Sequence, residues 1–367
     1  MVKYLVLSDI HFGHRVNKTN NIGKNIMFFL EQYRSILEGL DVLFIAGDLF
    51  DTFLPNYSTN YLLALDYITS IIRYCKANNI KLRILEGTPS HDWKQAKAIG
   101  KLIQDLKVDI DCKYIDDLYI EKIDDKHILY IPDEYKPTGE ETYSDVLKLL
   151  KKHNLETVDI GIFHGSFKYQ LPIELSSSLV EEDFLKIVTG YIHIGHIHTH
   201  STFKRIIAQG SFDRLAHGEE EDKGGVIVDL KTNNYLFLKN NKAMVFKTLD
   251  YSNIELENIS TEFKKDIRTI PPGSSIRILV KNTEISSSLN KLNFIKTNKT
   301  FIVKVVVKKD KKKDEKIYNN KMEISSLEVF EINKHNIKTL VEEELVKLEL
   351  TESEFKNSIS LLEELCL

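Results

Sequence analysis

Short runs of aliphatic and β-branched residues alternate with amphipathic stretches through the first part of this 367-residue chain. The first three apolar runs are residues 3–8, 42–46 and 81–85, and the stretches between them, around residues 26–37 and 61–74, have helical spacing. Buried strands that alternate with helices form βαβ units, whose strands pair in parallel. The sequence therefore predicts an α/β fold with parallel strands in this part of the chain.

More strands are expected further along. Residues 118–131 are typical of a hairpin, and a helix is expected around residues 142–153. Residues 158–163 and 191–194 have the composition of core strands, and residues 203–239 are rich in strand formers with glycine and asparagine pairs that indicate turns. These runs add further strands to the α/β unit.

Carboxylate and imidazole side chains follow the ends of several of these predicted strands. In α/β sheets the carboxyl edge of the strands is where ligands bind, so we expect the side chains to converge on one site. The residues concerned are Asp9, His11, Asp48, His91, Asp92, His164, His196 and His198.

Carboxylates combined with imidazoles make a mixed oxygen and nitrogen ligand set, which suits Mn²⁺, Fe²⁺ or Zn²⁺. A dinuclear site needs a bridging oxygen, and Asp48, central in the set, is the candidate bridge. Two cations about 4 Å apart can hold a hydroxide and neutralise a phosphoryl oxygen. His91 is not needed as a ligand, so we expect it to protonate the leaving oxygen or to stabilise charge on phosphorus. The set therefore predicts metal-dependent phosphoester chemistry.

The segments DIHFGH, GDLFD, HGS and GHIH, in this order, resemble the signature of calcineurin-like metallophosphoesterases. More narrowly, the chain is similar to SbcD-type nuclease subunits, since GDLFDTFLP matches the GDxFDxxxP of their bacterial and phage members. The resemblance covers essentially the whole length. It implies a β-sandwich flanked by helices, a smaller α+β capping domain, and a C-terminal helical pair.

The resemblance also implies roles for residues at matching positions. One metal would be held by Asp9, His11, Asp48 and His198, and the other by Asp48, His164, His196 and a ligand from the third motif. His91 would act on the phosphate, held by its neighbour Asp92. The implied cofactor is two Mn²⁺, with Mg²⁺ as an alternative. The implied activities are 3′→5′ exonuclease and endonuclease cleavage of double-stranded DNA, in recombination, repair or replication, by a homodimer paired with a coiled-coil, SMC-like ATPase.

The third motif departs from the family's usual Gly-Asn-His-Asp or Gly-Asn-His-Glu. It runs from Gly87 to Asp92 as GTPSHD, longer by two residues, with Ser90 in the place of the asparagine. A serine hydroxyl is a poorer ligand than an amide carbonyl. We therefore expect Ser90 or a water to complete the second metal's shell, and that metal to bind more weakly.

Each assignment has a plainer alternative. A strand-end aspartate such as Asp9 often caps a turn, and short histidine clusters also occur in loops. His14 either approaches the substrate phosphate or is an exposed loop residue, and Asp51 is a weaker candidate for a residue that supports the ligands. Two further histidines are expected to be structural or to support the ligands: His193 and His200.

Composition suggests where the chain divides. Residues 1–248 are expected to form the nuclease domain and residues 249–307 the capping domain, because the histidines nearly disappear after His217. Residues 308–322 begin with KKDKKKDEK and are expected to be a charged linker, either a solvated tether or a contact for DNA phosphate. Residues 323–367 are expected to form two amphipathic helices, which would bind the ATPase partner or fold back on the body.

Overall composition sets wider limits. The formal charge of −4 argues only weakly against a nucleic-acid partner, because net charge hides patches. The three cysteines have no metal spacing and fit a reducing compartment. The apolar run near the N-terminus is too short for a signal or spanning helix. We expect a soluble protein with no membrane partner, in the cytoplasm of a bacterial host or phage-infected cell.

The metal ligands cannot separate a DNA nuclease from a phosphoesterase that acts on a phosphoprotein, a cyclic nucleotide or a nucleotide-lipid, because the core chemistry is shared. The extra domain and helices favour the nuclease. A non-catalytic scaffold with a degenerate site is the third alternative, and the nearly complete ligand set argues against it.

Overall fold

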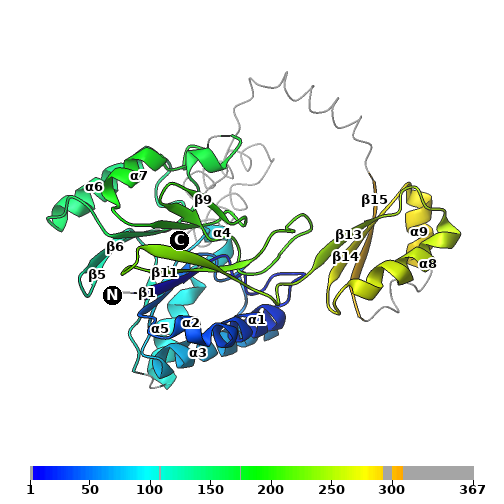
Figure 1. Ribbon diagram of the computed structural model, residues 1–367, viewed down its shortest axis with the longest axis horizontal. Coiled ribbons are helices and arrows are strands. Elements are labelled where there is room, and N and C mark those ends of the chain that lie inside the picture. The colour runs from blue at the N-terminus through cyan, green and yellow to red at the C-terminus, as the bar shows by residue number, and fades with distance from the viewer. Residues whose placement is uncertain (1–2, 107–108, 174, 292–299, 309–367) are drawn as a thin grey trace, which may run out of the picture.

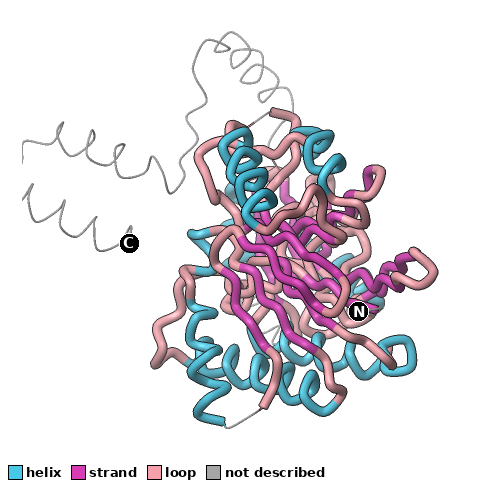
Figure 2. Tube along the Cα trace, turned by 90° about the vertical axis from the view of Figure 1, so that its left-hand side faces the viewer, coloured by secondary structure: helices cyan, strands magenta, loops and turns pink. Residues whose placement is uncertain are grey.

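The computed structural model describes residues 3–106, 109–173, 175–291 and 300–308. Over these residues it is a mixed α/β structure in which two six-stranded sheets stack between helices (Figures 1 and 2). The α/β class expected from the alternation of strands and helices is therefore confirmed.

The first sheet contains the three strands expected at the start of the chain. Its order is β12-β11-β1-β2-β3-β4, and the neighbours from β1 to β4 are parallel, as predicted. The last two strands to join, β11 and β12, run antiparallel to their neighbours. The strands are β1 (Lys3–Leu7), β2 (Val42–Ala46), β3 (Lys81–Leu85), β4 (Cys112–Ile115), β11 (Gly224–Asp229) and β12 (Asn234–Lys239).

The second sheet has the order β5-β6-β7-β8-β10-β9. The expected hairpin is its edge pair β5 and β6, and β6, β7, β8 and β10 are parallel. The strands are β5 (Tyr119–Ile123), β6 (Lys126–Ile131), β7 (Ile160–His164), β8 (Ile192–Gly195), β9 (Ser201–Phe203) and β10 (Ile206–Ala208).

Alternating residues of each strand serve two different cores. In β1, Tyr4 and Val6 face the second sheet and pack with residues such as Tyr130, whereas Leu5 and Leu7 face the helices. Successive side chains of a strand point to opposite faces, so a continuous apolar run is buried on both sides. This explains why the strands read as unbroken apolar runs in the sequence.

Helices cover the outer face of each sheet (Figure 1). Helix α1 begins at Thr19, seven residues before the expected start, and Gly23 lets it approach α3 closely, since a Cβ there would lie 2.2 Å from the ring of Tyr67. On the first sheet lie α1 (Thr19–Gln32), α2 (Arg34–Leu37), α3 (Thr59–Ala77) and α5 (Ala98–Leu106), and on the second α6 (Gly139–Lys152) and α7 (Glu181–Ile187). Short helical turns lie at α4 (Pro89–Asp92), Gln95–Lys97, Lys168–Gln170 and Ile267–Thr269.

A third, three-stranded parallel sheet follows, with the order β13-β14-β15 and its own apolar core. It begins at Phe246, so it straddles the boundary expected between residues 248 and 249. Its elements are β13 (Phe246–Asp250), α8 (Leu256–Asp266), β14 (Ser275–Val280), α9 (Thr283–Lys291) and β15 (Ile302–Val307). Apart from Lys308, the predicted linker and helical segment, residues 308–322 and 323–367, lie outside the described residues.

None of the helices in the described ranges is both long enough and apolar enough to cross a membrane.

Candidate metal centre

Two groups of three side chains meet at the carboxyl edges of the two large sheets. Asp9, His11 and His198 form one group, and Asp48, His164 and His196 form the other; within each group the ligand atoms lie within 4.8 Å of one another. Each group combines side chains that follow strands of the first sheet with histidines from the second sheet. The structure thus brings together the six residues that the sequence places in two separate ligand sets.

Asp48 lies between the two groups. Its Oδ1 is 3.3 Å from Nε2 of His164, and its Oδ2 is 3.6 Å from Nε2 of His11. One carboxylate therefore faces a histidine of each group with a different oxygen, which is the geometry that a bridging ligand requires.

Two of the histidines present ring nitrogens that have no hydrogen-bond partner. Nδ1 of His164 donates to the carbonyl of Ala46 over 2.7 Å, which leaves its Nε2 with a lone pair. Nε2 of His164 and Nε2 of His11 are buried without a hydrogen bond. An unpaired buried polar atom is costly unless something binds it, and a metal-ligating imidazole is typically fixed through its other nitrogen. These residues therefore fit a divalent cation.

The charges of the second group agree with this fit. Burial alone would raise the pKa of Asp48, but His164 and His11 hold that pKa well below its usual range. Burial would lower the pKa of His164, and Asp48 instead raises it well above the usual value. Without a cation a proton is therefore favoured between the two side chains, so proton and cation compete for the same place.

The backbone of the candidate ligands is held in an uncommon conformation. The φ angles of Asp9, His11, Asp48 and His196 are 51°, 57°, 50° and 96°, in the left-handed region. Non-glycine residues there are uncommon, and such strain gathers at functional sites. Glycine allows a close approach beside them, since a Cβ on Gly87 would lie 2.1 Å from the backbone nitrogen of Asp48.

The third motif contributes through Thr88. Its N–H donates to Oδ1 of Asp48 over 2.7 Å, and its hydroxyl lies 3.4 Å from Oδ2 of Asp48 and 3.3 Å from Nδ1 of His196. Ser90, which the comparison of motifs put in the asparagine's place, is exposed on α4. The residue of this motif that contacts the second group is therefore Thr88, which directly follows Gly87 as asparagine does in the family pattern.

His91 lies beside the first group. The ligand atoms of His91, His11 and Asp51 lie within 4.8 Å of one another. The sequence led us to expect the Asp92 carboxylate to hold His91, and the structure corrects this. Nδ1 of His91 is 2.7 Å from the backbone carbonyl of Asp51. Asp92 is buried, and its carboxylate accepts the N–H groups of Phe50 and Gly87 at 2.8 Å and 2.7 Å. Asp92 therefore ties together the loops after β2 and β3 and does not orient the imidazole.

Asp51 and His14 have supporting positions. Oδ1 of Asp51 is 3.2 Å from Nδ1 of His11, so Asp51 contacts a candidate ligand from behind. Nδ1 of His14 accepts the N–H of Asn17 over 3.0 Å and shapes the loop after β1.

The other two histidines of interest do not join the site. His193 is buried between the sheets with its Nε2 3.1 Å from the hydroxyl of Tyr4, and Nδ1 of His200 lies 2.8 Å from the carbonyl of Ala208. Their expected structural role is consistent with these contacts.

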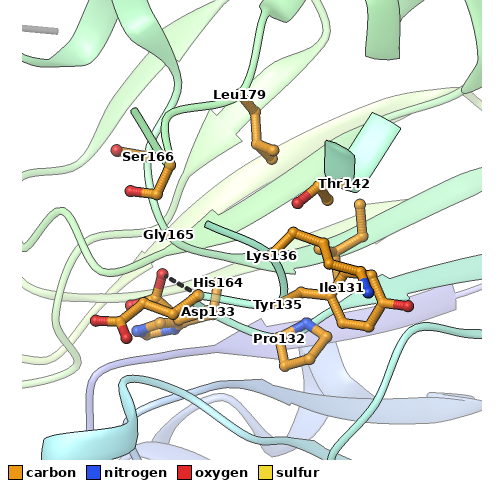
Figure 3. Close-up of a pocket in the computed structure, with 12 residues that line it drawn as sticks. Ile131, Pro132, Asp133, Tyr135, Lys136, Thr142, His164, Gly165, Ser166 and Leu179 are labelled. Carbon is orange, nitrogen blue, oxygen red and sulfur yellow. Dashed lines mark hydrogen bonds between the residues drawn. The ribbon is translucent and has the colours of Figure 1, made fainter. Parts of the chain in front are cut away.

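Two acidic residues beside the site were missed in the sequence. Oδ2 of Asp133 accepts the hydroxyl of Thr88 over 3.0 Å and is 3.7 Å from Nδ1 of His196, and Figure 3 shows Asp133 and His164 together at one end of a pocket. Oε1 of Glu219 is 3.1 Å from Nδ1 of His198. Asp133 lies two residues after the end of β6, so the rule that found the candidate ligands predicts its place. Glu219 lies in a loop that gives no such signal.

Comparisons with known proteins add little to this geometry. No family model and no curated protein matches the chain. A solved crystal structure aligns with 64% of this chain and 97% of its own, at 12% identity and a TM-score of 0.40. A likeness that low carries no argument about function.

Proposed function

We propose that this protein is a metal-dependent phosphodiesterase of the calcineurin-like class, and more narrowly an SbcD-type DNA nuclease subunit. The observation that carries the proposal is the position of Asp48, with one oxygen toward His164 and the other toward His11. That placement is what two cations with a shared carboxylate require.

In this proposal the two groups hold two Mn²⁺, or Mg²⁺. One cation would be held by the first group, Asp9, His11 and His198, together with Asp48. The other would be held by the second group, Asp48, His164 and His196, with Thr88 beside it. Bound cations would supply positive charge to the phosphoryl oxygens and lower the pKa of the attacking water. Asp133 faces Nδ1 of His196, and Glu219 faces Nδ1 of His198. These two carboxylates would orient the two rings.

His91 is the proposed proton donor. A carbonyl only accepts hydrogen bonds, so the contact with Asp51 places a hydrogen on Nδ1 of His91. Its Nε2 is then the nitrogen free to carry a proton to the leaving oxygen. A proton delivered to the leaving oxygen lets it depart as a neutral hydroxyl group rather than as a charged alkoxide.

DNA is proposed as the substrate because of the resemblance in the motifs and the additional domain that follows the main one. The proposed assembly is a homodimer with a coiled-coil ATPase, bound through the predicted helices of residues 323–367. The three-stranded unit at residues 246–307 would then be the capping domain.

A nuclease assay on linear duplex and single-stranded DNA with Mn²⁺ tests the proposal, with His91→Ala as the inactive control. We expect metal-dependent cleavage that EDTA abolishes. Cleavage of p-nitrophenyl phosphodiesters with DNA left intact would instead indicate a phosphoesterase of another substrate class. Loss of both activities, with and without the ATPase, would indicate a scaffold.

A further inference from the structure

Two aromatic rings are exposed together on the surface of the first sheet's loops. Phe53 is 56% exposed and Trp93 44% exposed, and their ring centroids lie 6.1 Å apart at an interplanar angle of 69°. Apolar rings of this size on a surface commonly mark a place where something binds.

The two rings belong to the same two loops as the proposed proton donor and its hydrogen-bond partner. Phe53 lies two residues after Asp51, whose carbonyl holds His91, and Trp93 lies two residues after His91 itself. Two residues span at most about 7 Å of chain. The rings are therefore carried by the loops after β2 and β3, close along the chain to His91 and to the carbonyl that holds it.

The rings are held in place by the loops that carry them. The side-chain amide of Gln95 donates to the carbonyl of Thr52 over 3.0 Å and accepts the N–H of Leu54 over 2.8 Å. The indole N–H of Trp93 donates to the carbonyl of Ser90 over 2.8 Å. Because the two loops are cross-linked and the indole is hydrogen-bonded, binding to these rings would cost less ordering than binding to rings on loose loops.

We propose that Phe53 and Trp93 form a stacking platform for an unpaired nucleobase next to the scissile phosphate. The inference rests on the proposed function and deepens it, since it names single-stranded or frayed DNA as the form that enters the site. Aromatic rings bind any base through its π-face, without reading the sequence. A base inside a duplex is covered on both faces by its neighbours, so it must leave the stack before it can use the platform.

A protein partner is the other occupant that two exposed rings suggest. A stable interface covers about 800 Å² on each partner, which needs a broad face. Two rings match the size of one base, and because their loops also carry His91 and Asp51, a base stacked on them would lie near the phosphate. A nucleobase is therefore favoured.

The kinetic test uses the full-length protein with Mn²⁺ and two kinds of single-stranded tetranucleotide. One kind carries adenine throughout, and the other carries an abasic tetrahydrofuran on either side of the scissile phosphate. We expect kcat/KM to be on the order of tenfold or more higher for the adenine substrate. In Trp93→Ala and Phe53→Ala this preference should shrink toward one while cleavage of the abasic substrate stays within about twofold of wild type.

Two variants serve as controls. Trp93→Phe keeps an aromatic face and should keep most of the preference. Tyr235→Ala removes a ring that is 40% exposed at the far end of the first sheet, where its partner Val228 pairs with Tyr4, and should change nothing.

Three results would overturn the platform and leave the nuclease proposal intact. They are equal cleavage of adenine and abasic substrates by wild type, an equal loss on both substrates in Trp93→Ala, and dissociation of a dimer by Trp93→Ala in light scattering. Failure of wild type to cut any oligonucleotide would overturn the nuclease proposal and the platform with it.

The chain offers a direct second measurement, since Trp93 is its one tryptophan. In a His91→Gln background with Mg²⁺, the adenine tetranucleotide should quench tryptophan fluorescence and the abasic one should quench it less. A kinetic preference for adenine without any quenching would place the base elsewhere and overturn the assignment.

Discussion

The imidazole of His91 donates its Nδ1 hydrogen to the backbone carbonyl of Asp51, over 2.7 Å. A carbonyl fixes the ring without adding a negative charge, unlike a carboxylate. The ring is thus oriented by the main chain of the loop after β2, and the identity of the side chain at position 51 matters little for this contact.

Replacing His91 by Gln should test its part in the reaction. We expect kcat on DNA to fall about 10²- to 10⁴-fold, the range for a lost proton donor. The loss should be much smaller for bis-p-nitrophenyl phosphate, because p-nitrophenolate leaves without a proton. Steady-state kinetics on both substrates provide the measurement, and equal losses would contradict the role.

Gly87→Ala should damage the site through a clash. The new Cβ would lie 2.1 Å from the backbone nitrogen and 2.3 Å from Oδ1 of Asp48, so Asp48 must move. We expect a loss of about 1–3 kcal/mol in the free energy of unfolding together with weaker Mn²⁺ binding. Urea denaturation and calorimetric titration measure the two effects.

The matched control is Gly100→Ala in α5, where a Cβ meets nothing within 4 Å. An exposed helical position should gain about 0.5–1 kcal/mol from the same change. If Gly100→Ala weakened Mn²⁺ binding as much as Gly87→Ala does, the clash would not be the cause.

Substitutions at Thr88 and Ser90 should affect Mn²⁺ binding differently. Thr88→Val removes the hydroxyl that contacts Asp48 and Asp133, and we expect Mn²⁺ affinity to fall about tenfold, as for other groups behind metal ligands. Ser90→Ala changes an exposed side chain, and the Mn²⁺ requirement should stay within about twofold. Mn²⁺ titration of activity compares them, and the reverse order would restore Ser90 as the ligand.

Stability should fall in weak acid because of His193. Burial lowers the pKa of His193 to about 3, whereas the unfolded chain takes up that proton near pH 6.5. Below pH 6.5 the unfolded state binds more protons, so the free energy of unfolding decreases as the pH falls toward 3. The expected loss is roughly 2–3 kcal/mol between pH 6.5 and 4.5.

Urea denaturation in EDTA at several pH values measures this slope without a contribution from bound metal. His193→Gln should flatten it. Tyr4→Phe removes the hydroxyl beside His193 but keeps the imidazole, so the slope should remain. A slope unchanged in His193→Gln would assign the acid sensitivity to other groups.

The sequence predicted the strands well because each is buried on both faces and appears as an unbroken apolar run. Residues 42–46 and 81–85 were located to the residue as β2 and β3. The start of α1 was missed because Asn20, Asn21 and Gly23 interrupt the apolar pattern of its first turns. In the structure, Gly23 allows the close approach of Tyr67.

The candidate ligands could be found because they directly follow strands, where chain order fixes position. The contacts of the GTPSHD segment could not, since its two extra residues leave the alignment with Gly-Asn-His ambiguous and only the turn at α4 decides between Thr88 and Ser90. The orientation of His91 was also beyond the sequence, because its partner is a main-chain carbonyl and carries no side-chain signal.

Each group of candidate ligands takes members from both sheets: Asp9 and His11 with His198, and Asp48 with His164 and His196. A cation in either group would thus cross-link the two sheets. Its binding would stabilise the packing of one sheet against the other, by about 2.7 kcal/mol at a free concentration one hundred times Kd. Chelation should accordingly lower the free energy of unfolding as well as the proposed activity. The stability of the protein would then depend on the concentration of free cation.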